Sequence, residues 1–465
     1  MPESRPTTGK FEAPPGGDQG LDIAVIGTGI AGLSAAWLLS KNHRVTVYEQ
    51  NAIVGGHSNT VDTTVAGRQI AVDTGFIVYN PVNYPNLVAL FDLLEVPTQT
   101  SDMSFAASLN DGALEYSGTD LNGLFAQRRN LVRPRFLSML RDLLRFYRQA
   151  PTLTDEDELR YVSLGDFLRR HNYGEAFIND HLLPMGGAIW SSSVEQMLAF
   201  PALSFLRFFR NHGLVQLRDR PEWRTVDGGS REYVSRLTAA TDATWLTGTT
   251  VEQVLRDNTG VTIVAGEQRR RHDQVVLPCH SDQALRLLDQ PTAAETQTLG
   301  AIRYQHNETI LHTDTSLMPR SRRAWASWNY VGSNNDESGD ALCVTYWMNL
   351  LQPIDTPEPL FVTLNPNRAI NPDHILQTFD YEHPIFDAAA LDSQSRLWQL
   401  QGQQNTWYCG AWFGSGFHED GIQAGLAVAE RLGGARRPWT VANESARISL
   451  PTSWLDASTD VREAA

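Results

Sequence analysis

The sequence predicts an α/β (α+β) fold in which a Rossmann-type dinucleotide-binding domain is interrupted by inserted segments. Two observations carry this prediction: a glycine-rich strand–turn–helix–strand unit near the N-terminus, and later glycine-rich segments that return to the same domain. With 465 residues, of which 42% are hydrophobic, the chain is long enough for two or three domains and a large core.

The dinucleotide-binding unit begins at the first apolar run of the chain. LDIAVIG predicts a strand, GTGIAGLSAAWLLS a turn and a helix, and RVTVYE a second strand. Gly27 allows the tight turn, Gly29 lets a pyrophosphate approach the backbone, and Gly32 lets the helix pack on the strand. Because a helix N-terminus attracts phosphate, we expect the cofactor at this turn, beside Ile30 and Ala31.

An acid ends the second strand, and a pair of glycines follows it. Glu49 is placed to accept hydrogen bonds from ribose hydroxyls, and Gln50 is its neighbour. Gly55 and Gly56 follow shortly afterwards and let the chain pass close to phosphates. The sequence therefore predicts that both glycine motifs contact one dinucleotide.

Later segments return to this domain. TVDGGSREYVSRL predicts a glycine turn entering a helix, TWLTGTTVEQVLRDNTGVTIVA a β-meander, and HDQVVLPC a strand. TWYCGAWFGSGFHEDGIQAG predicts a strand, a glycine-rich loop and a helix that begins near Gly421. The expected division is a disordered tail at 1–20, nucleotide-domain parts at 21–89, 225–285 and 401–435, a helical segment facing substrate or membrane at 90–224, a substrate-binding domain at 286–400 and a C-terminal tail at 436–465.

Composition argues against several classes of protein. A net charge of −15 disfavours a nucleic-acid partner, and no apolar run is long enough to span a membrane. The three cysteines are widely spaced, HExxH and GxSxG motifs are absent, and no metal site is predicted. The first 20 residues lack the apolar region of a signal peptide. We therefore expect a cytoplasmic protein, with peripheral contact to the inner face of the cytoplasmic membrane.

The pattern of GxGxxG, terminal acid and Gly-Gly resembles the flavin-containing amine oxidase superfamily, which includes phytoene desaturases and protoporphyrinogen oxidase. The resemblance covers most of the chain. It implies FAD as cofactor and a glutathione-reductase-type Rossmann FAD-binding domain with an inserted, amine-oxidase-like substrate domain. Many relatives continue the Gly-Gly pair with arginine, whereas this chain has His57 and Ser58. These side chains can still donate hydrogen bonds to a pyrophosphate; alternatively, His57 caps the loop.

The resemblance also implies contacts to the rest of the cofactor. DTGFIVYN is implied to pass the flavin ring, and GFHEDGIQAG to bring a helix N-terminus to the flavin end. Relatives often carry an acid after the glycine that matches Gly410, but Ala411 follows here, which leaves the ribityl contact open. The acids at 419 and 420 alternatively cap their helix. The implied contacts are Thr74, Gly75, Phe76 and Ile77 at the ring, Val251 at the adenine end, Glu419 or Asp420 at ribityl or phosphate-linked hydroxyls, and the backbone of Gly421 and Ile422.

Lysine is nearly absent from the chain. Only Lys10 and Lys41 occur, and 36 of the 38 basic residues are arginine. Many amine oxidases place a lysine near the flavin. Lys10 lies in the expected tail and Lys41 in the turn after the first helix, so neither is placed for that position, which counts against ordinary amine oxidation.

GGHSNTVD, VDTGFIVYN and the run that follows resemble a narrower group, bacterial FAD-dependent oxidoreductases associated with cyclopropane-fatty-acid synthase-type methyltransferases. This resemblance implies desaturation of a methylated fatty-acyl chain of a phospholipid, on the way to furan fatty acids. It also implies the methyltransferase as a partner. FAD would take an allylic hydride, His418 or Glu419 would remove the neighbouring proton, and oxygen or a quinone would accept the electrons. Alternatively, His418 is a loop residue that contacts the flavin edge. The alternatives are a flavin amine oxidase, a polyene or isoprenoid desaturase, and a non-catalytic FAD protein that assists the methyltransferase.

Residues 127–148 predict a basic amphipathic helix. The segment contains seven arginines and one acid, and a membrane-surface helix is one interpretation. The other is a core helix with a solvated basic face. LSFLRFFRNHGL (203–214) adds a second Arg/Phe cluster, and the aromatic residues of 325–347 either line an acyl tunnel or pack in a sheet. The expected apolar face of the helix comprises Phe136, Met139, Leu140, Leu143, Leu144 and Tyr147.

Overall fold

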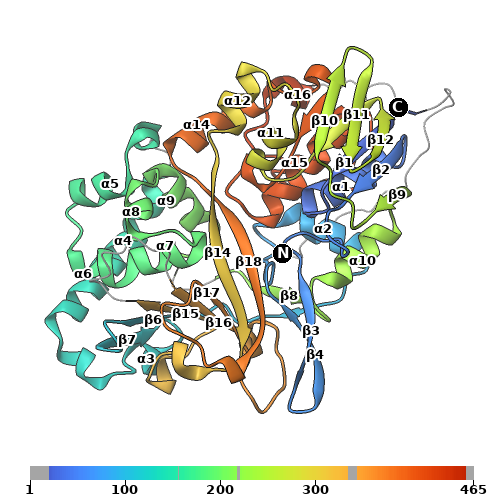
Figure 1. The fold of residues 1–465 in the computed structure, drawn as a ribbon. Helices are drawn as coiled ribbons and strands as arrows, with labels where there is room; N and C mark the ends of the chain where they lie inside the picture. The colour runs from blue at the N-terminus through green and yellow to red at the C-terminus, as the bar shows by residue number, and fades with distance from the viewer. Residues whose placement is uncertain (1–19, 155–156, 217–219, 333–342, 457–465) are drawn as a thin grey trace.

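The computed structural model describes residues 20–154, 157–216, 220–332 and 343–456 (Figure 1). The expected N-terminal tail, with Lys10, therefore falls almost wholly outside the described residues. None of the described helices combines the length and the apolar character needed to cross a bilayer.

A parallel five-stranded sheet forms the nucleotide-binding domain, which confirms the predicted fold class. Its order is β19-β13-β1-β2-β9, and each neighbouring pair is parallel. Helix α1 follows β1 directly, so its N-terminus lies at the carboxyl end of the sheet, where Rossmann folds bind dinucleotides. The elements are β1 (Asp22–Ile26), α1 (Ile30–Leu39), β2 (Arg44–Tyr48), β9 (Ala243–Leu246), β13 (Gln274–Leu277) and β19 (Thr406–Tyr408).

The last nucleotide-domain helix, α15, begins earlier than the sequence predicts. It spans His418–Arg431 rather than starting near Gly421, and it packs against α1. A Cβ at Gly421 would lie 2.8 Å from Ile30 Cγ2, and one at Gly425 would lie 2.3 Å from the Ala31 carbonyl oxygen. The two glycines therefore allow the helices to approach closely.

The predicted β-meander is only partly a meander. Its first strand, β9, joins the parallel sheet instead. The three-stranded antiparallel sheet is formed by β10 (Gln253–Asp257), β11 (Gly260–Ala265) and β12 (Gln268–His272).

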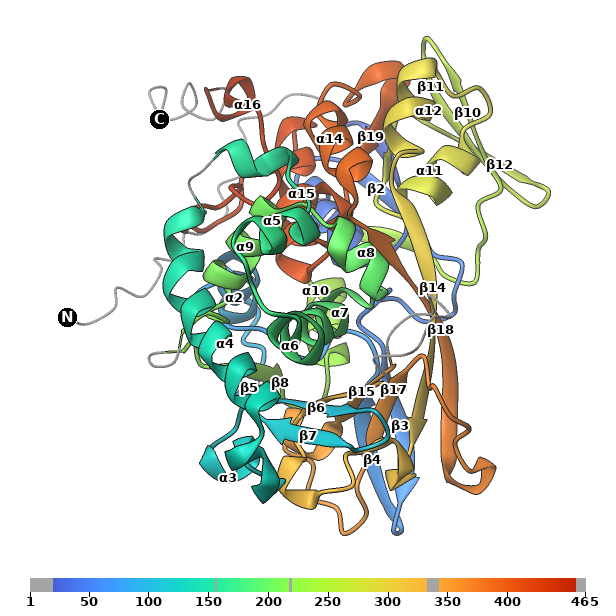
Figure 2. The same ribbon diagram turned by 90° about the vertical axis from the view of Figure 1, so that its left-hand side faces the viewer.

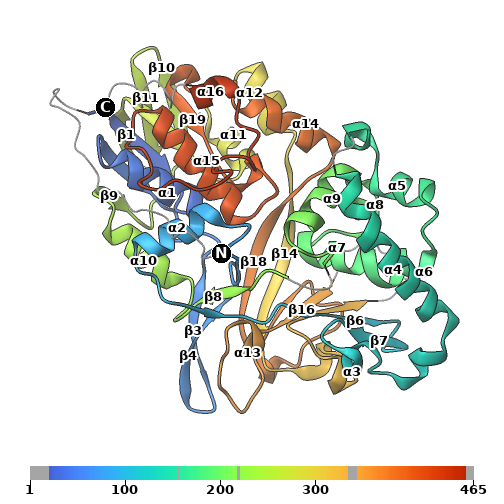
Figure 3. The same cartoon turned by 180° about the vertical axis from the view of Figure 1, so that it is seen from behind.

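A seven-stranded sheet forms the other half of the molecule. Its order is β18-β14-β17-β16-β15-β6-β7, and the two long strands β14 and β18 run up to the nucleotide domain (Figures 1 and 3). Strands β6 and β7 come from the range 90–224, for which the sequence predicts helices, because β6 pairs in parallel with the distant β15. The strands are β6 (Phe105–Leu109), β7 (Leu114–Ser117), β14 (Arg303–His312), β15 (Trp328–Gly332), β16 (Cys343–Trp347), β17 (Phe361–Leu364) and β18 (Ile375–Ile385).

A group of helices lies beside the seven-stranded sheet, with α4 along the outer edge of the molecule (Figure 2). The Arg/Phe cluster of 203–214 turns its phenylalanines inward: Phe205 and Phe209 stack at 4.1 Å, and Phe208 lies 4.6 Å from Trp190. They form a core and are not available to a membrane. The helices are α4 (Pro134–Leu153), α5 (Leu164–Arg170), α6 (Glu175–Phe177), α7 (Leu183–Trp190), α8 (Val194–Ala199) and α9 (Ala202–Asn211).

Part of the expected C-terminal tail packs on the nucleotide domain. Trp439 stacks on Trp37 of α1 at 5.7 Å, and Arg447 pairs with Asp420. Further elements are β3 (Thr60–Val65), β4 (Arg68–Asp73), β5 (Thr98–Thr100), β8 (Arg224–Val226), α2 (Pro85–Leu93), α3 (Leu121–Leu124), α10 (Arg231–Ala239), α11 (Ser281–Leu287), α12 (Ala293–Leu299), α13 (Met348–Leu351), α14 (Ala388–Leu397) and α16 (Thr452–Asp456).

Candidate active site

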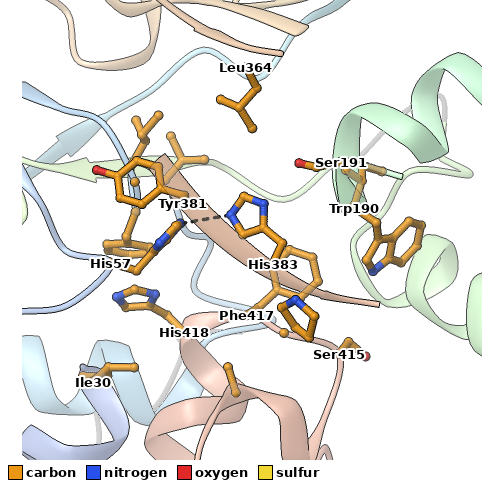
Figure 4. Close-up of a pocket in the computed structure, with 18 of the residues that line it drawn as sticks. Ile30, His57, Trp190, Ser191, Leu364, Tyr381, His383, Ser415, Phe417 and His418 are labelled. Carbon is orange, nitrogen blue, oxygen red and sulfur yellow. Dashed lines mark hydrogen bonds between the residues drawn. The ribbon is translucent and has the colours of Figure 1, made fainter. Parts of the chain in front are cut away.

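A cavity of about 1610 Å³ runs from the carboxyl end of the parallel sheet to the seven-stranded sheet and the helices beside it. Typical ligand pockets hold about 300–1,000 Å³. The cavity is therefore large enough for a dinucleotide and a second, extended ligand. Figure 4 shows the region where its two parts meet.

The dinucleotide end of the cavity is lined by loops of the Rossmann unit. A Cβ added at Gly29 would meet no atom within 4 Å, so this backbone borders open space. A Cβ at Gly56 would lie 2.9 Å from Gly29 Cα, so the two glycine motifs touch each other at this point. The predicted residues that line this end are Gly27, Gly29, Ile30, Ala31, Glu49, Gln50, Gly56 and Val251.

Further contacts of the predicted residues hold this surface in place. A Cβ at Gly32 would lie 2.1 Å from the Gly27 carbonyl oxygen, so glycine is needed for helix packing. Gly55 has a φ of +130°, and its N–H donates to Thr28 Oγ1. Glu49 accepts from the backbone N–H groups of Thr28, at 3.1 Å, and Asn51, at 2.9 Å, which hold its carboxylate at the tip of β2.

This end of the cavity fits FAD. The open space at Gly29, the close backbone of Gly56 and the fixed carboxylate of Glu49 provide a phosphate cradle and a ribose acceptor. The glycine motifs would hold the pyrophosphate, and Glu49 the ribose.

The segment predicted to pass the flavin ring also lines the cavity. Thr74, Gly75, Phe76 and Ile77 all face it, as does Gly410. The Phe76 ring stacks on the His418 imidazole with a centroid separation of 3.7 Å. This loop and the start of α15 thus form one wall.

His418 is held by two hydroxyl groups. Its Nε2 lies 3.0 Å from Ser58 Oγ and 3.1 Å from the Tyr233 hydroxyl. Ser58 is buried behind the cavity wall and does not line the cavity. Burial, and to a smaller extent the nearby His57, holds the pKa of His418 well below 6.5. The imidazole is therefore neutral near pH 7 and keeps one nitrogen as a proton acceptor.

Glu419 does not face the cavity. Its carboxylate accepts from the N–H groups of Asn86 and Leu87 at the start of α2, and from the side chains of Asn86 and Gln423. Burial raises its pKa, opposed by these hydrogen bonds. The structure therefore gives this candidate base a different position: because α15 begins at His418, its first turn directs residue 419 toward α2.

The remaining predicted residues of α15 also make their contacts away from the cavity. Asp420 accepts from Ser415 N and Phe417 N, and pairs with Arg447 at 2.6 Å. The Gly421 N–H donates to the Phe417 carbonyl oxygen, and Ile422 is fully buried. Neither acid lines the cavity, so the helix-capping alternative describes Asp420.

Replacing Glu419 with alanine is expected to lower the free energy of unfolding by about 2–4 kcal/mol, because several buried donors lose their acceptor. Flavin reduction in the folded fraction should persist. Glu419→Gln keeps one acceptor oxygen and should recover part of the stability. Urea unfolding and single-turnover flavin reduction separate the two effects: a stable Glu419→Ala protein that cannot reduce its flavin would restore the catalytic reading.

His383 and Tyr381 of β18 are site residues that the sequence analysis missed. Figure 4 shows both above His418, with His383 facing His57. Asn307 Nδ2 donates to His383 Nδ1 at 3.0 Å, so neutral His383 carries its hydrogen on Nε2, 3.4 Å from His57 Nε2. The signal was present in TFDYEHP, where alternate residues of a strand place Phe379, Tyr381 and His383 on one face.

Both imidazoles are neutral near pH 7. Burial and the neighbouring histidines lower the pKa of His383 to about 3 and that of His57 to about 4. The accessible surface of His57 borders the cavity, and the surrounding protein still desolvates the ring. Because His57 Nε2 faces the His383 hydrogen, His57 carries its own hydrogen on Nδ1 and can donate it without a positive charge.

The far end of the cavity is largely apolar. Trp328 and Tyr346 of the aromatic segment line it, packed edge to face at 4.8 Å, whereas Tyr330 is buried in the core. Leu140, Leu143, Leu144 and Tyr147 of α4 line it too, and Phe136 and Met139 of the predicted apolar face lie in the core.

Lys41 is the one lysine within the described residues, and it lies away from this cavity. Its Nζ donates to the Ala240 carbonyl oxygen at the far end of the nucleotide domain. No described lysine therefore lines the cavity.

Solved structures of similar fold include the following three, all at low sequence identity. A CLA-producing fatty acid isomerase from P. acnes has 16% identity and a TM-score of 0.64, covering 88% of this chain and 98% of its own. Cyclohexylamine oxidase from Brevibacterium oxydans IH-35A has 15% identity and a TM-score of 0.64, covering 89% and 98%. A putrescine oxidase bound to putrescine has 15% identity and a TM-score of 0.63, also covering 89% and 98%.

Family membership follows from the sequence itself. A search of curated proteins finds no match to this chain. The sequence model of the family described as flavin containing amine oxidoreductase matches residues 30–364, which is more than half of the chain. The chain therefore belongs to the flavin-containing amine oxidoreductase family, and its cofactor is FAD.

Proposed function

We propose that this protein dehydrogenates an unsaturated, methylated fatty-acyl chain of a membrane phospholipid. The observation that carries the proposal is the long apolar end of the cavity, bounded by Trp328, Tyr346 and Leu364 and extended along α4. An acyl chain needs such an apolar surface. In addition, no described lysine lines the cavity, which counts against ordinary amine oxidation. The fatty acid isomerase of similar fold acts, by its name, on the same class of molecule.

The chain's own residues would bind and orient the acyl chain and exclude water. Bound FAD would supply a two-electron acceptor for a hydride, and oxygen or a quinone would then reoxidise it. The substrate loses that hydride and a proton from adjacent carbons and gains one C=C bond. The neutral imidazole of His418 is the candidate proton acceptor. His57 is a candidate hydrogen-bond donor to the cofactor.

A flavin amine oxidase is the second candidate function. The edge-to-face pair of Trp328 and Tyr346 is an arrangement that can enclose a cation, and two of the structures of similar fold are amine oxidases. A non-catalytic FAD protein that assists a lipid methyltransferase is the third possibility.

The first test is the anaerobic visible spectrum of the FAD-loaded protein before and after substrate. Monomeric lipid with a methylated monounsaturated chain is expected to bleach the oxidised flavin band near ~450 nm. Leu364→Trp should slow this bleaching about tenfold or more, because it fills the apolar end. Leu376→Trp, on the exposed part of β18, is the control. Bleaching by amines alone would support a flavin amine oxidase. If neither the lipid nor an amine bleaches the flavin, the non-catalytic FAD protein would be supported.

A further inference from the structure

Part of the α4 region exposes apolar side chains that a protein in water normally buries. In the turn before the helix, Leu131 is 51% and Val132 79% exposed, and Leu137 and Leu144 follow on the helix itself. Leu137, Arg141, Leu144 and Arg148 are spaced by four, three and four residues and so share one stripe. Leu144 belongs to the predicted apolar face, most of which points inward, whereas Leu131, Val132 and Leu137 lie outside that face.

One residue of this stripe also lines the cavity. Leu144 is 47% exposed and Leu121 of α3 is 74% exposed, yet both line the cavity. The next stripe of α4, with Leu140, Leu143 and Tyr147, continues inward along the cavity wall. We infer that the cavity opens to the surface beside Leu121 and Leu144, at a mouth between α3 and α4. Helix α4 runs along one edge of the molecule (Figure 2).

Positive charge surrounds the same mouth. Within the described residues, Arg128, Arg129, Arg133 and Arg148 have no carboxylate partner; they donate to carbonyl or amide oxygens. Of the other arginines, Arg135 pairs with Asp180, while two pair with Asp142.

Three acids that line the cavity have hydrogen-bond or ion-pair partners, and one of them, Asp102, accepts from Ser104 N. Asp120 accepts from Gly123 N, and Glu222 pairs with Arg224. The face is thus basic within a chain of net charge −15.

We propose that this face, formed by Leu121, residues 128–133 and the Leu137–Arg148 stripe, docks on the surface of an anionic phospholipid bilayer, with the cavity mouth opening into it. Arginine side chains bind lipid phosphates. Exposed leucine and valine side chains can bury themselves at the boundary between the headgroups and the acyl chains. An acyl chain then enters the cavity without crossing water. This inference deepens the proposed function and rests on it for the identity of the substrate, although binding itself can be measured without turnover.

Sedimentation with vesicles tests the docking face. FAD-loaded protein should bind vesicles of phosphatidylglycerol and phosphatidylcholine more tightly than vesicles of phosphatidylcholine alone, with the difference lost at high salt. Arg128→Glu/Arg129→Glu and Leu131→Ser/Val132→Ser should each weaken binding about tenfold or more. None of these four residues lines the cavity, so flavin bleaching by monomeric lipid should stay unchanged.

Matched controls lie elsewhere on the molecule. Arg269→Glu/Arg270→Glu makes the same charge change on the exposed strand β12, at the opposite end of the view in Figure 1. Ile53→Ser removes an apolar residue as exposed as Val132, at 79%. The proposal would be overturned if the variants and the controls lost vesicle binding equally. It would also be overturned if the protein did not bind anionic vesicles, or if it formed a defined dimer through this face. Vesicle binding without flavin bleaching would leave docking standing and count against the proposed function.

Discussion

Replacing Gly29 with valine is expected to give a folded protein that purifies without FAD. The backbone of Gly29 has φ −62° and ψ 172°, which any residue adopts, and an added Cβ meets no protein atom within 4 Å. The branched side chain would instead occupy the space where the pyrophosphate approaches the backbone. We expect a loss of FAD affinity on the order of a hundredfold or more, about 3 kcal/mol.

The measurement is the ratio of bound flavin to protein, with the unfolding midpoint of the apoprotein as a check on folding. Gly29→Ala should show a smaller loss than Gly29→Val. Gly118→Val is the control, because Gly118 lines the opposite part of the cavity and its Cβ would have only the Phe105 carbonyl oxygen nearby, at 3.9 Å. Full flavin content in Gly29→Val would show that the cofactor lies elsewhere.

Acid is expected to destabilise the protein strongly between pH 6.5 and 5. Burial lowers the pKa of His181 to about 4, of His212 to about 3 and of His312 to about 4. In the unfolded chain each titrates near ~6.5, so below that pH the unfolded state binds more protons than the native state. Stability is therefore lost as the pH falls, by about 1.4 kcal/mol per pH unit for each histidine.

Asp73 opposes this loss only partly. Burial raises its pKa to about 6, so the native state takes up a proton there earlier than the unfolded chain does, and stability rises by about 1 kcal/mol between pH 7.5 and 5.5. These three histidines alone lose about 4 kcal/mol over the same range, and His57, His383 and His418, whose pKa values are also lowered, act in the same direction. The net loss is a large part of a typical stability of about 5–15 kcal/mol.

Urea unfolding at pH 7.5, 6.5 and 5.5 measures this slope. His312→Gln should reduce it by about 1.4 kcal/mol per pH unit, since one titrating group is removed. His306→Gln is the control, because its side chain is exposed. Identical slopes in the native protein and His312→Gln would contradict the assignment of the acid sensitivity to buried histidines.

The nucleotide domain could be predicted because its signals are local. Gly27, Gly29, Gly32 and Glu49 act within one short strand–turn–helix–strand unit, so their spacing alone describes the geometry. The seven-stranded sheet could not be predicted from the sequence, because it depends on pairing between segments that are far apart along the chain. β6 became a strand by pairing with β15, more than 200 residues away along the chain.

The same difference between local signals and contacts between distant segments explains the errors at the site. The periodicity of 127–148 identified an apolar face, but it could not say that the face would line a cavity. Glu419 and His418 are neighbours in sequence, and only the starting point of α15 decides that the histidine faces the cavity and the glutamate faces α2. His383 was missed because its partner, His57, is over 300 residues away.

The order in which the parallel sheet is assembled bears on how the enzyme acquires its cofactor. β1 and β2 leave the ribosome first, but β19 and α15 are made only after residue 405, and Trp439, which stacks on Trp37, later still. Chains are synthesised from the N-terminus at about 5–20 residues per second, and domains fold as units. The sheet that binds FAD is therefore incomplete for nearly the whole of translation, and loading with flavin is a late event in the life of the chain.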